Sequence, residues 1–181
     1  MGIEREMRRL CADLVTGLGP PTARSSDLCV ALCAAMGERR GRPVVFRAAA
    51  FPAGTASGLW LDLADQDVVV VEERTAPEHQ LVILGHELWH MNAGHQGRDG
   101  PGGPVTTRLL GATLDERALR ETARAVAART DFDAAEEREA ERFGLLLASK
   151  CRAWSGGSSS RDPGRRDHLA GRIEASLGYL R

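Results

Sequence analysis

Residues 85–97 read GHELWHMNAGHQG and bring together side chains that can bind a metal ion and move a proton. His86 and His90 are four positions apart, so on an α-helix they lie about 40° apart around the axis and about 6 Å along it. Their imidazoles then stand side by side, at a span that one zinc ion can bridge. Glu87 can reach the open position of that ion, where a carboxylate takes a proton from bound water. The pattern predicts a zinc-dependent hydrolytic site.

A helix around this motif also has a separate apolar stripe that would anchor it in a core. Leu81, Leu84, Leu88 and Met91 recur at helical spacing. The alternative interpretation is that both histidines are hydrogen-bonded at the edge of that core without a metal. His79 lies about two turns before His86, too far away to share an ion, and we expect it at the rim of the site.

A third protein ligand is needed, and His95 is the nearest candidate in the sequence. One class of zinc peptidases carries HExxHxxGxxH, with the third histidine ten positions after the first. That position is Gln96 here, with His95 one residue early and Gly94 one residue late. The turn that brings the third histidine back would have to be rebuilt, so we do not expect His95 to be the ligand.

A glutamate from a later helix is the other common solution. The segment 134–148 reads AAEEREAERFGLLLA, and a helix centred on Ala140 would place Glu136 and Glu137 at the rim of its buried face. Unpaired glutamates are costly to bury, and a metal is one good reason to bury them. Ion pairs with some of the many arginines are the alternative.

The elements that must position these residues follow from periodicity and turn signals. The predicted helices are 2–17 (Ile3, Met7, Leu10 and Leu14 buried), 25–37 (Leu28, Leu32 and Met36 buried, ending at Gly37), 76–93, 113–129 and 133–153; the predicted strands are 43–47, 57–63 and 67–71. The fold class is therefore α+β, mostly helical, with a small three-stranded antiparallel sheet before the HExxH helix.

The domain organisation follows from composition. Residues 1–154 form one domain that includes the N-terminal helices, and residues 155–164 (SGGSSSRDPG, after Trp154) form a flexible linker. In residues 165–181, an amphipathic helix carries Leu169, Ile173, Leu177 and Leu180. We expect its apolar face to dock back on the domain.

Composition narrows the class of protein. The chain has 181 residues, 43% hydrophobic and 27% charged, with a formal net charge of −1. Such a charge argues against a nucleic-acid binder that works through bulk electrostatics. The charged start and the lack of a long apolar run predict a cytoplasmic protein without a membrane segment. The four cysteines form no CxxC pair, so buried, reduced thiols are expected.

Two motifs in order resemble the ImmA/IrrE family of zinc metallopeptidases. The first is the HELWH helix after a small sheet, and the second is EREAERFGLL at 137–146. The resemblance covers about residues 40–150 and implies a zincin-like domain. It implies that His86, His90 and Glu137 bind Zn2+ and that Glu87 is the general base and acid. Trp89 and Gly144 depart from the family pattern, and the interval between the motifs is longer than usual.

The resemblance also implies a function. Such a protein would hydrolyse a peptide bond in a partner, a helix-turn-helix repressor or an antitoxin of a toxin–antitoxin pair, with no direct contact to nucleic acid. One alternative is a non-cleaving toxin or regulatory binding protein that keeps the zinc fold; another is a general peptidase for small peptides. For the oxyanion, His95, His168 and Tyr179 are the candidates that the sequence offers.

Overall fold

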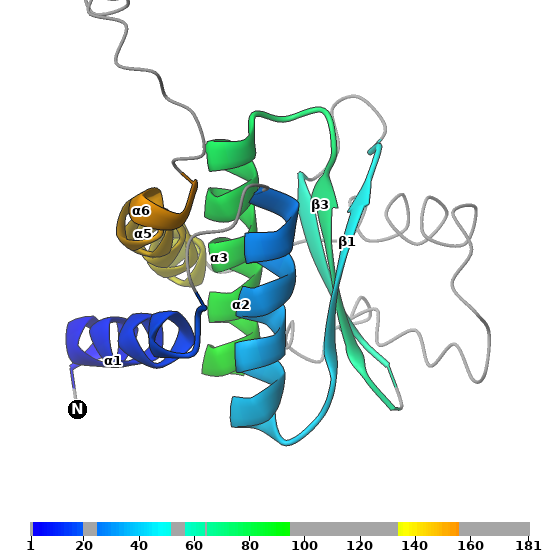
Figure 1. Ribbon diagram of the computed structural model, residues 1–181. Helices are drawn as coiled ribbons and strands as arrows, with labels where there is room; N and C mark the ends of the chain where they lie inside the picture. Colours follow the sequence, from blue (N-terminus) through cyan, green and yellow to red (C-terminus); the bar gives the residue numbers. More distant parts are fainter. Residues whose placement is uncertain (1, 20–24, 52–56, 64, 95–133, 156–181) are drawn as a thin grey trace, which may run out of the picture.

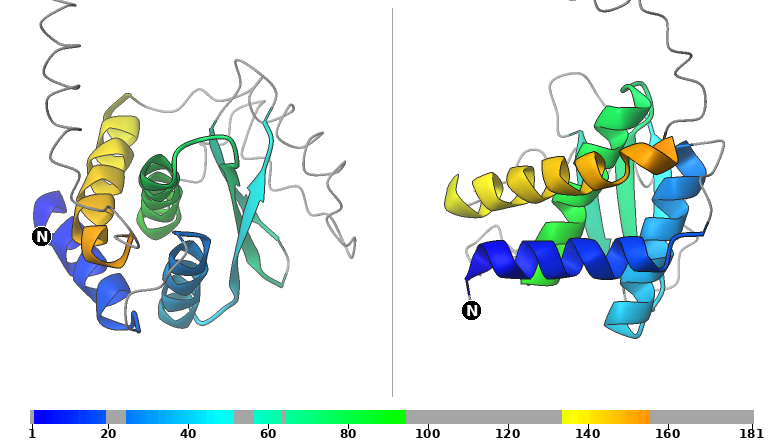
Figure 2. Two further views of the ribbon diagram at one scale, coloured as in Figure 1. Left: turned by 45° about the horizontal axis from the view of Figure 1, so that its top comes forward. Right: turned by 60° about the vertical axis from the view of Figure 1, so that its left-hand side comes forward.

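The computed structural model describes residues 2–19, 25–51, 57–63, 65–94 and 134–155. Within these ranges the helices lie on one face of a three-stranded sheet (Figure 1). Helices α2 and α3 are next to the sheet, and α1 and α5 lie outside them (Figure 2). The predicted helix 113–129, the linker from residue 156 on and the tail helix 165–181 are outside the described residues. The mixed α+β, mostly helical class is confirmed.

Two N-terminal helices form one wall of the core. Helix α1 spans Ile3–Thr16 and buries Met7, Leu10 and Leu14 as predicted, whereas Ile3 is 41% exposed. Helix α2 spans Ser25–Arg40 and buries Leu28, Leu32 and Met36. The predicted end at Gly37 is wrong. The helix continues to Arg40 and ends before Gly41, whose φ of +70° is the left-handed conformation that glycine adopts readily.

The sheet contains β1 (Val44–Ala49), β2 (Gly58–Asp62) and β3 (Asp67–Glu72) in the order β1-β3-β2. Strand β2 pairs with β3 in the antiparallel direction, as predicted. The prediction that all three strands are antiparallel is wrong, because β1 pairs with β3 in parallel. The valine run 68–71 explains this order, since a strand that is apolar on both faces belongs in the centre with one neighbour on each side.

Helix α3 (Pro77–Ala93) follows the sheet, and α5 (Ala134–Lys150) with the short α6 (Arg152–Ser155) crosses behind it. Proline opens α3, and Gly94 ends it at a φ of +66°, so the predicted bounds are confirmed within one residue. One apolar cluster fills the space between the helices and the sheet, and a second, including Leu59, Leu61 and Val70, covers the other face of the sheet.

The four cysteines lie in the helical core. Cys11, Cys29, Cys33 and Cys151 are buried, reduced thiols, as predicted. Burial raises the pKa of the Cys29 thiol to about 12 and that of the Cys151 thiol to about 11. These thiols therefore stay protonated at neutral pH and behave as small apolar side chains.

A buried carboxylate ties the sheet to α2 and α3. Asp67 is fully buried and accepts hydrogen bonds from Trp60 Nε1 and Arg40 Nε, both at 3.0 Å. Arg42 Nε lies 3.5 Å from the same carboxylate. Arg40 also donates to the carbonyl of Met91 at 3.0 Å, near the C-terminal end of α3. This network therefore fixes that end of α3 against the sheet.

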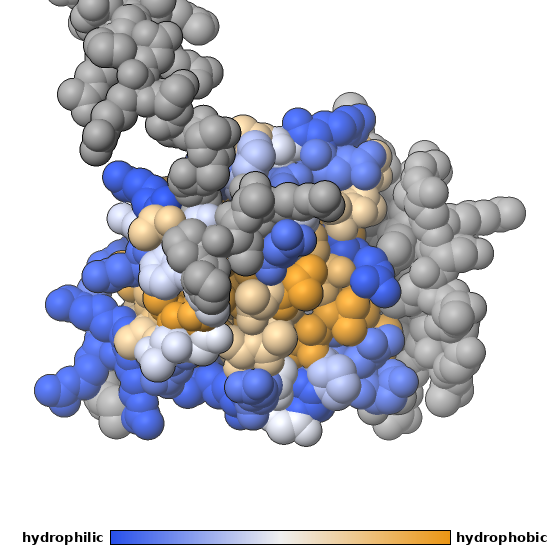
Figure 3. Space-filling view, in the orientation of Figure 1, coloured by the Kyte–Doolittle hydropathy of each residue, from blue (hydrophilic) through white to orange (hydrophobic). Residues whose placement is uncertain are grey.

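The outer surface of the described residues differs between helices. Figure 3 shows hydrophilic side chains over α1 and a more apolar area over α2, where Val30 is 55% exposed. Within the described ranges, no helix combines the length and the apolar character that crossing a membrane requires.

We predict that Asp67→Asn destabilises the fold by about 1–3 kcal/mol, because the two arginines lose their charged acceptor. Asp62→Asn is the matched control, since Asp62 also pairs with Arg42 but is 27% exposed. The control is expected to lose less than about 1 kcal/mol. Urea unfolding measures both variants, and equal losses would contradict the role assigned to Asp67.

Candidate metal centre

Helix α3 presents two histidines one turn apart. Their Nε2 atoms lie 3.0 Å from each other, and the ring centroids are 4.7 Å apart. Leu84 and Leu88 are fully buried on the core side of the same helix and fix its rotation. His90 is 3% exposed, while the His86 side chain is 22% exposed. The pair therefore opens toward one side of the helix, at the edge of the core.

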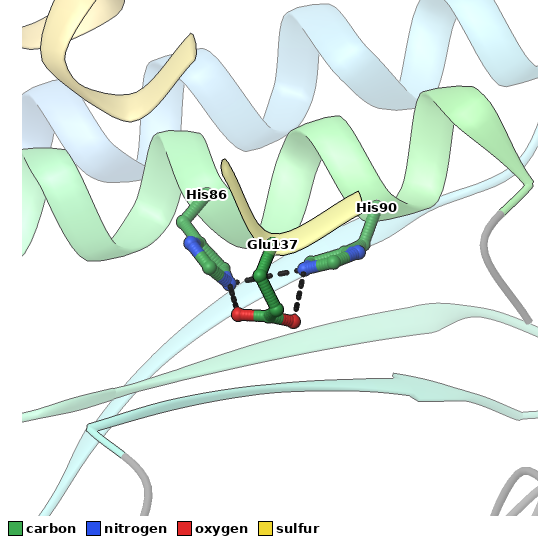
Figure 4. A group of neighbouring side chains, drawn as sticks. All are labelled: His86, His90 and Glu137. Carbon is green, nitrogen blue, oxygen red and sulfur yellow. Dashed lines mark hydrogen bonds and ion pairs between the residues drawn. The ribbon is translucent and has the colours of Figure 1, made fainter. Parts of the chain in front are cut away.

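Helix α5 brings a carboxylate to the histidine pair. Glu137 Oε2 lies 3.5 Å from His86 Nε2, and Glu137 Oε1 lies 3.3 Å from His90 Nε2 (Figure 4). One ligating atom from each residue lies within 4.8 Å of the others, and among the described residues this is the group that could hold a metal ion. Glu136 is not part of it. Of the two glutamates that helical geometry allowed, Glu137 is the one that meets the histidines.

The two helices meet through facing glycines. A Cβ atom on Gly85 would lie 2.8 Å from Gly144 Cα, and one on Gly144 would lie 2.4 Å from the carbonyl oxygen of Val82. Trp89 and Phe143 pack beside this crossing, with ring centroids 5.3 Å apart. Trp89 and Gly144 are therefore parts of one helix contact, which sets the distance from α5 to the histidines.

The polar atoms that His86, His90 and Glu137 turn toward one another are mostly hydrogen-bond acceptors. A histidine Nε2 carries at most one proton, and an ionised carboxylate has none. Glu137 Oε1 is buried and, apart from its 3.3 Å contact with His90 Nε2, accepts no hydrogen bond from the described residues. Burial lowers the pKa of His86, and Glu141 opposes this. Burial first, then Glu141 and Glu136, raise the pKa of Glu137. A cation would satisfy these facing acceptors together, so the group can hold a metal ion.

The side chain of Glu87 extends from α3 to β2, where its carboxylate lies against Gly58. Its carboxylate accepts a hydrogen bond from the backbone N–H of Trp60. Burial and, to a smaller extent, the nearby Glu137 raise the pKa of Glu87 to about 8, and the Trp60 bond opposes this. A bound cation nearby would lower that pKa, because it stabilises the ionised carboxylate.

Other residues considered from the sequence lie elsewhere. His79 is exposed on the first turns of α3 and outside the metal-binding group, as expected. His95, His168 and Tyr179 fall outside the described residues. Arg142, on the same helix as Glu137, contacts Glu4 of α1.

Sequence reasoning missed Gly58 and Trp60, which border Glu87. A Cβ on Gly58 would lie 2.6 Å from Glu87 Oε1. A glycine inside a strand often marks a position where another group approaches closely, and this signal was present in the sequence.

Comparison of the chain with protein-family models, with curated proteins and with solved structures finds no match.

We predict that Gly144→Ala destabilises the protein by about 1–3 kcal/mol, because the added methyl group meets the backbone of α3. Helix propensity alone predicts the opposite sign, a gain of about 0.5–1 kcal/mol. Gly17→Ala is the control, since a Cβ at Gly17 has nothing within 4 Å. Thermal and urea unfolding give the sign of the change in the free energy of unfolding. A Gly144→Ala variant as stable as the parent would contradict the close crossing.

Proposed function

We propose that the chain is a zinc-dependent endopeptidase of the ImmA/IrrE type, which hydrolyses a peptide bond in a partner protein. The observation that carries this proposal is the meeting of His86, His90 and Glu137, from two helices, with Glu87 on the next position of α3. Three protein ligands with one carboxylate beside them, and a fourth position left for water, are typical of catalytic zinc sites.

The donor set suits zinc in chemistry and in spacing. Two imidazoles and one carboxylate are ligands that zinc binds commonly. With metal–ligand distances near 2.0–2.1 Å, tetrahedral coordination separates neighbouring donor atoms by about 3.3 Å. The separations between Nε2 and Oε atoms here are 3.0, 3.3 and 3.5 Å. Little movement would be needed to seat an ion.

In this mechanism His86, His90 and Glu137 would hold the ion. When bound, zinc polarises the scissile carbonyl and makes water more acidic. Glu87 takes the proton from the attacking water and then delivers it to the nitrogen of the leaving amine. Glu87 is not part of the group whose ligating atoms lie within 4.8 Å of one another, so it can act as a base without being a ligand itself.

The edge of the sheet supports an extended peptide as substrate. Strand β2 is an edge strand among the described strands. Just outside β2, Ser57 accepts a hydrogen bond from the N–H of Glu72, and Leu63 donates one to the carbonyl of Gln66. Because antiparallel pairing alternates, the backbone groups of Gly58 and Asp62 and the carbonyl of Trp60 point to the open edge, where the Trp60 N–H bonds to Glu87. A substrate segment could add there as a further strand, next to Glu87.

The identity of the partner rests on the resemblance. A helix-turn-helix repressor or an antitoxin, in the cytoplasm, is the proposed substrate. The second candidate function is a regulatory protein that binds such a partner without cutting it. The carboxylate of Glu87 favours cleavage, because a purely structural zinc site has no need of a base beside the metal.

We predict that Glu87→Gln reduces cleavage by about 10²–10⁴-fold, because the site loses its proton acceptor. Zinc-loaded parent and variant are incubated with lysate of the source cells, and new protein N-termini are identified by mass spectrometry. Cleavage products that appear with the parent alone support the proposal. Equal products from both proteins would contradict the role of Glu87, and unchanged biological activity of the variant in cells would favour the binding protein.

A further inference from the structure

Strand β2 comes unusually close to the side chain of Glu87. An added Cβ on Gly58 would lie 2.6 Å from Glu87 Oε1 and 2.5 Å from Ile83 Cγ2. Carbon atoms almost never approach other heavy atoms this closely, so a larger residue at Gly58 would force Glu87 or Ile83 to move. The missing side chain of Gly58 thus leaves the space that the carboxylate occupies.

The neighbouring residue on the same face of β2 holds the carboxylate. The Trp60 N–H, which points to the open edge of the sheet, donates to Glu87. The Trp60 indole is itself fixed, because its Nε1 donates to Asp67 at 3.0 Å and the Arg40 guanidinium lies 5.7 Å above its ring. Glu87 is therefore positioned from the sheet, whereas His86, His90 and Glu137 are positioned by the helix crossing.

We propose that Gly58 and the backbone N–H of Trp60 are the positioning elements for Glu87, and that β2 thereby aligns the base with a substrate bound along its own edge. This inference rests on the proposed function for its catalytic consequence, but the contact itself does not. It predicts that the placement of the base can be damaged while the three metal ligands stay in place.

The contact is tested first without any activity measurement. Full-length parent, Gly58→Ala, Glu87→Ala and the double variant are unfolded in urea with zinc present in all samples. Gly58→Ala is expected to lower the folding equilibrium constant about tenfold more in the parent than in the Glu87→Ala background. The loss of stability that Gly58→Ala still causes in the Glu87→Ala background is assigned to the contact with Ile83. Equal losses in both backgrounds would overturn the proposed contact.

Hydrogen exchange tests the Trp60 bond and does not require Gly58→Ala to fold. In Glu87→Ala the Trp60 amide loses its acceptor, so its exchange is expected to become about tenfold faster, as loss of one hydrogen bond allows. Glu78→Ala is the control, since Glu78 is an exposed glutamate of the same helix. An unchanged exchange rate at Trp60 in Glu87→Ala would overturn the proposal.

The catalytic consequence is measured on a peptide cut by the parent. Gly58→Ala is expected to lower kcat about 100-fold, with a smaller change in KM, because misplacing a catalytic group by about 1 Å has an effect of this size. Zinc content is expected to equal that of the parent. Gly19→Ala, where a Cβ has nothing within 4 Å, is the control. A Gly58→Ala variant with unchanged kcat would overturn the positioning role.

The two proposals fail in different ways. If the parent cuts nothing while the unfolding and exchange results stand, the proposed function fails and the contact between β2 and Glu87 remains. If the parent cuts peptide and Gly58→Ala cuts it equally fast, the proposed function stands and the inference about β2 fails.

Discussion

The close crossing of α3 and α5 is the constraint on which the candidate site depends. Gly85 and Gly144 let the two backbones meet, and no larger side chain fits between Gly144 and the carbonyl of Val82. Two turns before that crossing on α5, Glu137 reaches the histidine pair of α3. Because helices are stiff over such a distance, a small change at the glycines would move the carboxylate away from the imidazoles. Packing and candidate chemistry are thus one feature of this fold.

A second constraint comes from the sheet side. Asp67 anchors Trp60 and Arg40, and Trp60 in turn donates to Glu87. The three residues that can hold a metal ion and the carboxylate beside them are consequently supported by different elements. Under the proposed function, this division would let the ion and the base be positioned independently of each other. The buried hydrogen bonds of Asp67 therefore help to position the site, in addition to the apolar packing of the core.

Part of this arrangement was predictable from local sequence. The spacing of His86 and His90 and the apolar stripe of α3 are properties of one helix. The angular positions of residues around α5 reduced the candidates for the third metal ligand to Glu136 and Glu137. The parallel pairing of β1, the facing glycines and the place of Gly58 depend on contacts between segments far apart in the chain. Sequence periodicity does not encode such contacts, so the close approach of Gly144 to the backbone of Val82 could not be predicted.

Metal content of the purified protein tests the central claim most directly. Mass spectrometry under native conditions is applied to the full-length parent and to Glu136→Ala and Glu137→Ala, all refilled with zinc and freed of excess. The account predicts about one zinc per chain in the parent and in Glu136→Ala, and loss of zinc in Glu137→Ala, because three protein ligands hold such an ion. A folded parent that binds no zinc would contradict the account and leave the histidine pair as a hydrogen-bonded edge of the core.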